Sequence, residues 1–126
     1  MSKLLAIFLG ACFLVSSGLI STGAHARDVA AGKKVFKKCK ACHYAAKDKN
    51  KTGPHLVNLI GREAGTVEGY KYSKAMKSSG IVWDENTLTA YLRAPKTYLE
   101  GTKMVFAGLK KDADIANVIA YLKAQP

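Results

Sequence analysis

The chain of 126 residues is strongly basic: 20 Lys and Arg stand against nine Asp and Glu, for a formal net charge of +11 at pH 7. The length accommodates one domain of ordinary size rather than several. Such a charge would suit a nucleic-acid partner, but no basic motif interleaved with aromatic residues occurs, so no nucleic acid is expected.

The N-terminal segment has the pattern of a signal peptide. Lys3 supplies a positive charge, residues 4–20 are uncharged and mostly apolar, and residues 24–26 read Ala-His-Ala, the small-residue pattern that precedes cleavage. We therefore expect residues 1–26 to be a cleaved signal peptide and residues 27–126 to be the mature domain. Removal of the segment implies export to the periplasm of a Gram-negative bacterium, with no stable membrane insertion after cleavage.

Two alternatives to cleavage would keep the protein on a membrane. The apolar run could remain as an anchor, although it is at the low end of spanning length. Residues 9–12 (Leu-Gly-Ala-Cys) also resemble a lipoprotein box, which would leave Cys12 acylated. Cleavage after Ala26 instead leaves only Cys39 and Cys42, with 19 basic and nine acidic residues and a net charge of +10.

The first half of the mature domain begins with a predicted helix. Asp28 can cap it, and apolar residues recur at intervals of three and four from Val29 to Phe36. Residues 47–69 contain Gly, Pro and Thr and are typical of a loop. A weaker, short helix is expected over residues 72–77.

The second half contains two stronger helical patterns. Asp84 can cap one, which ends before Pro95, and Asp112 opens the last helix, where apolar residues follow the i, i+3, i+4, i+7 spacing. Residues 96–109 are a second long loop. Loops of this length are unusual in a small domain unless they surround a ligand. With no alternating strand pattern, we predict an all-α fold of helices and loops wrapped around one bound group.

Residues 39–43 read Cys-Lys-Ala-Cys-His, and this motif carries the chemistry. Two thiols at i and i+3 lie on one side of a helical turn and can add to the two vinyl groups of haem, and the histidine at i+4 extends that face toward the iron. We expect Cys39 and Cys42 to bind one haem c through thioethers and His43 to be the proximal ligand.

Three other interpretations of the motif fit less well. A thioredoxin-like redox pair belongs in a βαβ setting, which the sequence lacks. A tetrahedral zinc site needs four ligands, and only His55 remains to complete it. A plain disulfide would leave the position of His43 accidental.

The sixth coordination position of the iron has three candidates: Met76, Met104 and His55. Met76 is in a helical segment and fits a core position. Met104 lies between Gly101 and Gly108, which allow the backbone to approach a flat cofactor closely. Met104 is therefore the leading candidate by pattern.

Further motifs follow one another along the chain. They are residues 32–36 (Gly-Lys-Lys-Val-Phe), 39–43, 51–54 (Lys-Thr-Gly-Pro), 80–83 (Gly-Ile-Val-Trp), 91–92 (Tyr-Leu), 101–111 and 119–123 (Ile-Ala-Tyr-Leu-Lys). In these motifs and their order, the mature chain resembles the mitochondrial-type class I cytochromes c, including their periplasmic bacterial members. The resemblance implies the class I cytochrome c fold.

The resemblance also implies roles around the haem. His43 and Met104 match the axial ligands, and Pro54 matches the residue whose carbonyl accepts a hydrogen bond from the proximal imidazole. Residues near a buried propionate are matched by Arg62, Tyr72 and Trp83, although the two aromatic residues also suit an ordinary core. Tyr91 and Thr102 match residues beside the Met ligand, and Phe106 is expected among the residues that bind the cofactor.

The resemblance also implies one packing contact, and the chain departs from the family pattern at three positions. Gly32 and Phe36 match the contact of the first helix with the last. Met76 stands where a polar amide is usual, and Glu100 stands where a proline is common. His55 also replaces a residue of another type, and we expect it at the surface rather than on the iron.

The resemblance assigns seven lysines to a ring around the exposed haem edge: Lys34, Lys38, Lys51, Lys96, Lys103, Lys110 and Lys111. Such a ring would steer the protein to acidic surfaces of redox partners, such as a terminal oxidase, a bc1-type complex, a reaction centre or a dehydrogenase. A monomer that binds briefly suits this role.

The sequence thus predicts a non-enzymatic protein: a soluble periplasmic one-electron carrier with a His/Met-ligated haem c, shuttling electrons between respiratory or photosynthetic partners. The main alternative is a dedicated haem subunit, or electron acceptor, of a single periplasmic dehydrogenase. A third interpretation treats the iron as open and reactive, in a peroxidase or gas-binding role.

Overall fold

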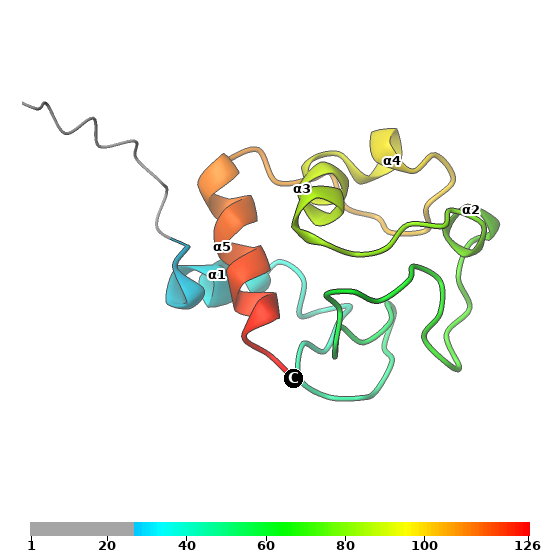
Figure 1. Cartoon of the computed structure of the whole chain (residues 1–126), viewed down its shortest axis with the longest axis horizontal. Helices are drawn as coiled ribbons and strands as arrows, with labels where there is room; N and C mark the ends of the chain where they lie inside the picture. Colours follow the sequence, from blue (N-terminus) through cyan, green and yellow to red (C-terminus); the bar gives the residue numbers. More distant parts are fainter. Residues whose placement is uncertain (1–26) are drawn as a thin grey trace, which may run out of the picture.

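The computed structural model describes residues 27–126, and the predicted signal peptide lies outside the described residues. Its elements are α1 (Val29–Phe36), α2 (Lys74–Lys77), α3 (Glu85–Arg93), α4 (Pro95–Tyr98) and α5 (Asp112–Lys123). Within this range the only sheet-like feature is an isolated bridge between Glu63 and Val82. Figure 1 shows α1 crossing α5 on one side, with α3 and α4 above and long loops below. The all-α expectation is confirmed.

The crossing of α1 and α5 depends on a glycine. A Cβ at Gly32 would lie 1.9 Å from the Asn117 carbonyl oxygen and 2.8 Å from the Cβ of Tyr121, so only glycine lets the helices approach this closely. One turn further, the Phe36 and Tyr121 rings are tilted at 43° with centroids 5.3 Å apart. The predicted contact between the first and last helices is confirmed.

Side-chain caps explain where two of the longer helices begin. Asp28 Oδ1 accepts a hydrogen bond from the Ala31 N–H at 3.0 Å. Asp84 Oδ1 accepts from the Thr87 N–H at 2.8 Å, and Thr87 Oγ1 accepts from the Asp84 N–H at 2.9 Å, which completes a reciprocal capping box. The Asp84 carboxyl therefore has a pKa below its ordinary value, mainly because of the Thr87 N–H.

Two details differ from the sequence prediction. Helix α2 begins at Lys74, two residues later than expected, because Ser73 is its N-cap and its Oγ accepts from the Met76 N–H at 3.1 Å. By contrast, α5 begins at Asp112, as predicted. Helix α4 was not predicted: Pro95 ends α3 and also starts this new turn, where its missing N–H has no cost.

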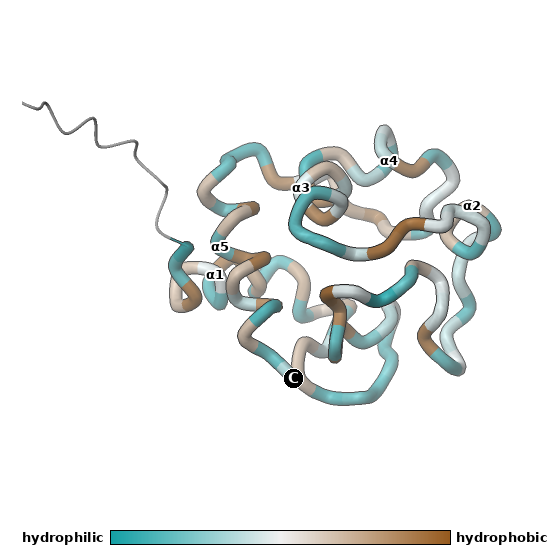
Figure 2. The backbone as a smooth tube through the Cα atoms, viewed as in Figure 1, coloured by the Kyte–Doolittle hydropathy of each residue, from teal (hydrophilic) through white to brown (hydrophobic). Residues whose placement is uncertain are grey.

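The core of the domain is small and lies between α1, α3 and α5. Ile115 and Val118 of α5 are almost completely buried. The long loop after residue 43 is mostly hydrophilic, as the teal tube in the lower part of Figure 2 shows. No helix within residues 27–126 combines the length and the apolar character needed to cross a membrane. The loops enclose a space beside the helices and also add residues such as Leu59, Ala64 and Trp83 to the core.

Candidate functional site

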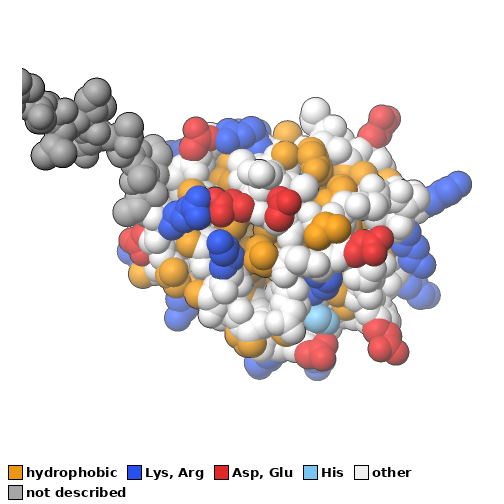
Figure 3. Space-filling model, viewed as in Figure 1, with side chains coloured by type: hydrophobic (Ala, Val, Ile, Leu, Met, Phe, Trp, Pro, Cys, Tyr) orange, Lys and Arg blue, Asp and Glu red, His pale blue; other side chains and the backbone are white. Residues whose placement is uncertain are grey.

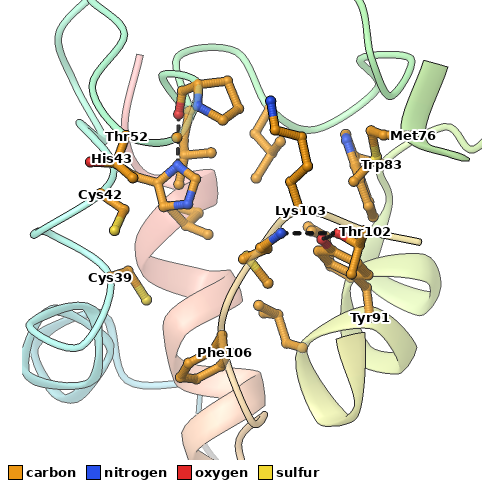
Figure 4. A pocket seen from close by; sticks show the side chains of 18 of the residues that line it. Cys39, Cys42, His43, Thr52, Met76, Trp83, Tyr91, Thr102, Lys103 and Phe106 are labelled. Atoms are coloured by element: carbon orange, nitrogen blue, oxygen red, sulfur yellow. Dashed lines mark hydrogen bonds between the residues drawn. The ribbon is translucent and has the colours of Figure 1, made fainter. Parts of the chain in front are cut away.

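A largely apolar pocket opens between the helical core and the loops (Figure 4). Its wall includes side chains from the end of α1, from α2, α3 and α5 and from the segment before α5. All the residues predicted to hold the cofactor or its iron line this pocket: Cys39, Cys42, His43, Pro54, Arg62, Tyr72, Trp83, Tyr91, Thr102, Met104 and Phe106.

The Cys-Lys-Ala-Cys-His motif is a tight turn that follows α1. The Cys39 carbonyl accepts hydrogen bonds from the N–H groups of Cys42 and His43, both at 3.0 Å, so the two thiols and the imidazole are held on one turn. Neither cysteine is in a disulfide. Burial raises the pKa of the Cys39 thiol, which Lys38 partly opposes, so this thiol is held in its protonated form.

His43 is fixed by the loop that follows the turn. Its Nδ1 is 2.7 Å from the Pro54 carbonyl oxygen, and because a carbonyl can only accept, this places the proton on Nδ1 and leaves Nε2 as the free ligand atom. A Cβ at Gly53 would lie 2.4 Å from Cε1 of the ring, so glycine is required beside it. Burial lowers the pKa of His43, which favours the neutral imidazole that can bind a metal.

Met104 lies in an extended strap, residues 101–109, that crosses the pocket. Exposure alternates along the strap: Thr102, Met104 and Phe106 are partly buried, whereas Lys103 and Val105 are exposed. This alternation is that of extended chain, in which successive side chains point to opposite sides. The strap therefore directs Met104 into the pocket, whereas its more exposed neighbours Lys103 and Val105 line the pocket where it meets solvent.

Two side chains beside Met104 are joined by a hydrogen bond. The hydroxyl oxygens of Tyr91 and Thr102 are 2.8 Å apart. Burial raises the pKa of Tyr91, which the bond to Thr102 partly offsets. Tyr91 also contacts Trp83, with ring centroids 5.1 Å apart.

Arg62, Tyr72 and Trp83 supply polar groups to a pocket that is otherwise apolar. Arg62 donates from Nη1 to the Val57 carbonyl at 2.8 Å and from Nη2 to the His55 carbonyl at 3.0 Å. The Tyr72 hydroxyl accepts from the Val67 N–H, which leaves its own proton free to donate. Burial lowers the pKa of Arg62 and raises that of Tyr72.

The two other candidates for the sixth position are placed differently. Met76 is buried and lines the pocket (Figure 4). His55 does not line it. The side chain of His55 is only 14% exposed, and its Nε2 lies 2.9 Å from Asp48 Oδ1. His55 thus lies away from the pocket, partly buried against the exposed Asp48 of its own loop.

The seven lysines predicted to dock partners are all exposed, but three of them also bond within the chain. Lys51 Nζ donates to the Lys40 carbonyl at 2.6 Å, Lys110 Nζ donates to the Ala107 carbonyl at 3.2 Å, and Lys103 Nζ donates to the Lys71 carbonyl. On the side shown in Figure 3, basic and acidic side chains are interspersed.

Sequence reasoning missed Val105, which is 93% exposed and also borders the pocket. It is the most exposed of the large apolar side chains within residues 27–126. The only signal for it in the sequence is its alternation with Met104 along the strap.

The donor set and the shape of the pocket fit haem c. Two thiols and an imidazole with a free Nε2 lie on one wall, a methionine lies on the strap, and the lining between them is apolar. The backbone at Gly53 passes so close to the His43 ring that there is no room for a Cβ between them. Within residues 27–126 no group of three or more His, Cys, Asp or Glu could hold a metal ion without such a cofactor.

Comparison with known proteins gives a consistent result. The family described as "Cytochrome c" matches residues 29–126. Cytochrome c-550 of Nitrobacter winogradskyi is 54% identical over 96 residues, 75% of this chain and 88% of the relative. Cytochrome c2 of Afifella marina is 52% identical over 99 residues, 75% of this chain and 80% of the relative.

The solved structure of cytochrome cH from Methylobacterium extorquens superposes with a TM-score of 0.74 at 44% identity, covering 78% of this chain and 99% of that one. The helices and the loops around the pocket are thus arranged as in a known member. The chain therefore belongs to the cytochrome c family, as a class I member with one covalently attached haem c and a role in electron transfer rather than enzymatic catalysis.

Proposed function

We propose that this protein is a diffusible one-electron carrier of the periplasm in which His43 and Met104 are the two axial ligands. One observation carries the proposal: an imidazole with its Nδ1 bonded to Pro54 and the inward-facing methionine of the strap line the same apolar pocket. Haem c supplies the one-electron couple of its iron. Two protein ligands close the iron to small molecules, which favours electron transfer over binding or activation.

The surrounding residues keep the ligands in place and tune the site. The Pro54 carbonyl fixes the tautomer and orientation of His43 and increases its basicity. A thioether ligand is soft and favours the ferrous state, which raises the reduction potential. Because the imidazole of His43 is already held by its hydrogen bond to Pro54, this ligand has little need to move when an electron arrives or leaves.

A second group of residues would donate hydrogen bonds to the haem propionates. Arg62, Tyr72 and Trp83 are suitable donors for a carboxylate, whose burial without partners would be costly. The terminal nitrogens of Arg62 each carry a second N–H beyond the bonds to Val57 and His55. The Tyr72 hydroxyl proton is likewise available.

The exposed side of the strap supports docking at the pocket opening. Val105 projects into solvent with lysines on both sides of it along the chain, Lys103 and Lys110. A small apolar centre with a basic rim suits brief contact with an acidic redox partner: charge speeds the encounter and the apolar contact orients it. Oxidases, bc1-type complexes, reaction centres and dehydrogenases are the partner classes we propose.

Export follows from the pattern of residues 1–26, which we propose to be a signal peptide that is removed before residue 27. Intact-mass measurement on the protein purified from a Gram-negative host tests this directly. The expected species is residues 27–126 plus one haem. A mass that corresponds to a diacylated chain beginning at Cys12 contradicts it.

The ligation is tested by spectroscopy of the ferric protein and by Met104→Ala. The wild type should show the methionine-to-iron charge-transfer absorption and should not bind carbon monoxide rapidly when reduced. Met104→Ala should lose the absorption, bind carbon monoxide and have a lower reduction potential. The matched control Met76→Ala should retain the absorption. If Met76→Ala loses it and Met104→Ala does not, the ligand is Met76.

A further inference from the structure

His43 and His55 lie on the same loop, and their rings are held in opposite tautomers. The proton of His43 is on Nδ1, which faces the Pro54 carbonyl oxygen (Figure 4). In His55, Nδ1 accepts a hydrogen bond from the Val57 N–H at 3.3 Å, and because an N–H can only donate, this nitrogen carries no proton. The proton of the neutral ring is therefore on Nε2, which lies 2.9 Å from Asp48 Oδ1. The His55 ring thus joins a backbone N–H on one side to a carboxylate on the other.

The segment around His55 is irregular backbone, so its polar groups need partners outside a helix or a sheet. The His55 N–H bonds to Asn50 Oδ1 at 3.1 Å, and the Leu56 N–H bonds to the Tyr44 carbonyl at 2.8 Å. Within residues 27–126, no backbone carbonyl accepts from the Val57 N–H, so the ring of His55 is its partner. The side chain of His55 therefore completes the hydrogen bonding of its own segment.

Arg62 is oriented by the carbonyl groups of this same segment. Its Nη2 donates to the His55 carbonyl at 3.0 Å, and its Nη1 donates to the Val57 carbonyl at 2.8 Å. Both backbone groups of Val57 are thus engaged, the N–H by the ring of His55 and the carbonyl by Arg62. A shift of Val57 would move one of the two acceptors that direct the guanidinium toward the pocket.

We propose that the Asp48–His55 pair positions Arg62 for a haem propionate. The proposal rests on the proposed function, in which Arg62 is a donor to the propionate. Asp48 accepts the Nε2 proton and so keeps Nδ1 free to hold Val57, which in turn holds the guanidinium. The Asp48 side chain is 86% exposed, so it orients the ring without burying a second charge beside Arg62. Neither His55 nor Asp48 lines the pocket, so both are positioning residues that act through Arg62.

The reduction potential of the holoprotein reports on the position of Arg62. A positive charge near the haem favours the ferrous state, which has one positive charge fewer, so a guanidinium that moves away lowers the potential. The measurements are made at pH 8, above the range in which histidine side chains ordinarily titrate, so that the neutral ring is compared with uncharged substitutes.

His55→Leu removes both hydrogen bonds of the ring. The equilibrium constant for reduction by a fixed reference couple should fall about 2- to 5-fold, the size of effect that one partly exposed ion pair has. His55→Asn is the conservative variant, because its side-chain oxygen can take the position of Nδ1 and accept from the Val57 N–H. It should recover most of the loss.

A matched pair of variants at Asp48 separates the hydrogen bond from the charge. Asp48→Ala and Asp48→Asn remove the same negative charge, but only the asparagine retains an oxygen that accepts from Nε2. The potential of Asp48→Ala should therefore lie below that of Asp48→Asn. Because Asp48 is exposed, neither substitution leaves a cavity, and both variants should keep the unfolding midpoint of the wild type.

Nitrogen-15 NMR of the reduced holoprotein reads the tautomer of His55 directly. The expected spectrum has the proton on Nε2. A proton on Nδ1 would leave the Val57 N–H without its acceptor in the ring, and it would overturn the proposal.

Arg62→Gln distinguishes failure of this proposal from failure of the proposed function. If Arg62→Gln leaves the potential unchanged, Arg62 is not the partner of the propionate, and both assignments are overturned. If it lowers the potential but His55→Leu does not, or if the two Asp48 variants have equal potentials, only the positioning role is overturned. In the Arg62→Gln background, His55→Leu should have little further effect. A full additional effect would show that His55 acts on the haem by another route, which also overturns the positioning role.

Discussion

The hydroxyl groups of Tyr91 and Thr102 lie 2.8 Å apart, and this bond joins α3 to the strap two residues before Met104. Thr102 Oγ1 also lies 3.4 Å from the Met104 N–H, at the outer limit of a hydrogen bond. Thr102 is thus the point at which the buried face of α3 reaches the proposed methionine ligand.

Replacement of Thr102 by Val should weaken Met104 ligation. The change retains the shape of the side chain but leaves the buried Tyr91 hydroxyl without its partner, at a cost of about 1–3 kcal/mol. The measurement is the denaturant midpoint at which the methionine-to-iron absorption disappears, which should fall. Thr97→Val on α4 is the control, and equal effects of the two variants would contradict the prediction.

Stability should fall at alkaline pH because of buried tyrosines. Burial raises the pKa of Tyr91 and Tyr72 above the ordinary value of about 10. Between the unfolded and folded pKa values, the unfolded state has already released protons that the folded state retains, so the free energy of unfolding decreases as pH rises. The contribution of these tyrosines to stability is fully present below pH ~10, and it is lost as the pH rises through their pKa in the folded state.

The measurement is the free energy of unfolding at several values between pH 9 and 12 for the wild type and Tyr91→Phe. Phenylalanine has no proton to lose, so the variant should show a shallower decrease. An identical slope for the two proteins would assign the alkaline loss to other groups.

Replacement of Gly32 by Ala should strongly destabilise the domain. The added methyl would lie 1.9 Å from the Asn117 carbonyl oxygen, and backbone cannot move as a side-chain end can. We expect a loss of about 3 kcal/mol, despite the higher helix propensity of alanine. Thermal unfolding measures it, and Lys33→Ala on the exposed face of α1 should change the midpoint only slightly.

Partner reactions should slow as salt is added. Because residues 27–126 carry 19 basic and nine acidic residues, we expect electrostatic steering of the encounter, which salt screens beyond about 10 Å at 0.1 M. The second-order rate of oxidation by a purified membrane oxidase should fall steeply between low and physiological ionic strength. A rate that does not change with ionic strength would contradict electrostatic steering.

Val105→Ser should act on the same reaction in a different way. Loss of an exposed apolar side chain leaves the charge unchanged, so the salt dependence should keep its slope while the rate falls at every salt concentration. Val29→Ser on α1 is the control, since Val29 is exposed but does not line the pocket.

The helices could be predicted because their signals are local. Asp28 and Asp84 cap helices in the positions that their spacing from the apolar face indicates. Helix α4 could not be predicted, because a proline after a helix usually indicates only that the helix ends. Here Pro95 both follows α3 and begins the next helical turn. The start of α2 was misplaced because the Ser73 cap is a weaker signal than the apolar Tyr72 before it.

The pocket was predictable residue by residue, but its supports were not. The Cys-x-x-Cys-His motif and the family pattern named side chains that the fold does bring into one cavity. The engagement of Lys103 depends on a carbonyl 32 residues away, and no sequence pattern encodes which carbonyl a lysine will meet. The burial of His55 depends in the same way on how its loop folds around Asp48 and Arg62.

The crossing of α1 and α5 determines when, during synthesis of the chain, the domain can complete its core. The Asp28 N–H also bonds to Asn117 Oδ1 at 2.9 Å, and the Asn58 N–H bonds to the Pro126 carbonyl at 2.9 Å, so the last residues of the domain bond both to its beginning and to its first long loop. A chain that lacks its final helix has no partner for α1 and cannot close its core. The contact between α1 and α5, and with it the core, can therefore be completed only after the last residues of the chain have been made.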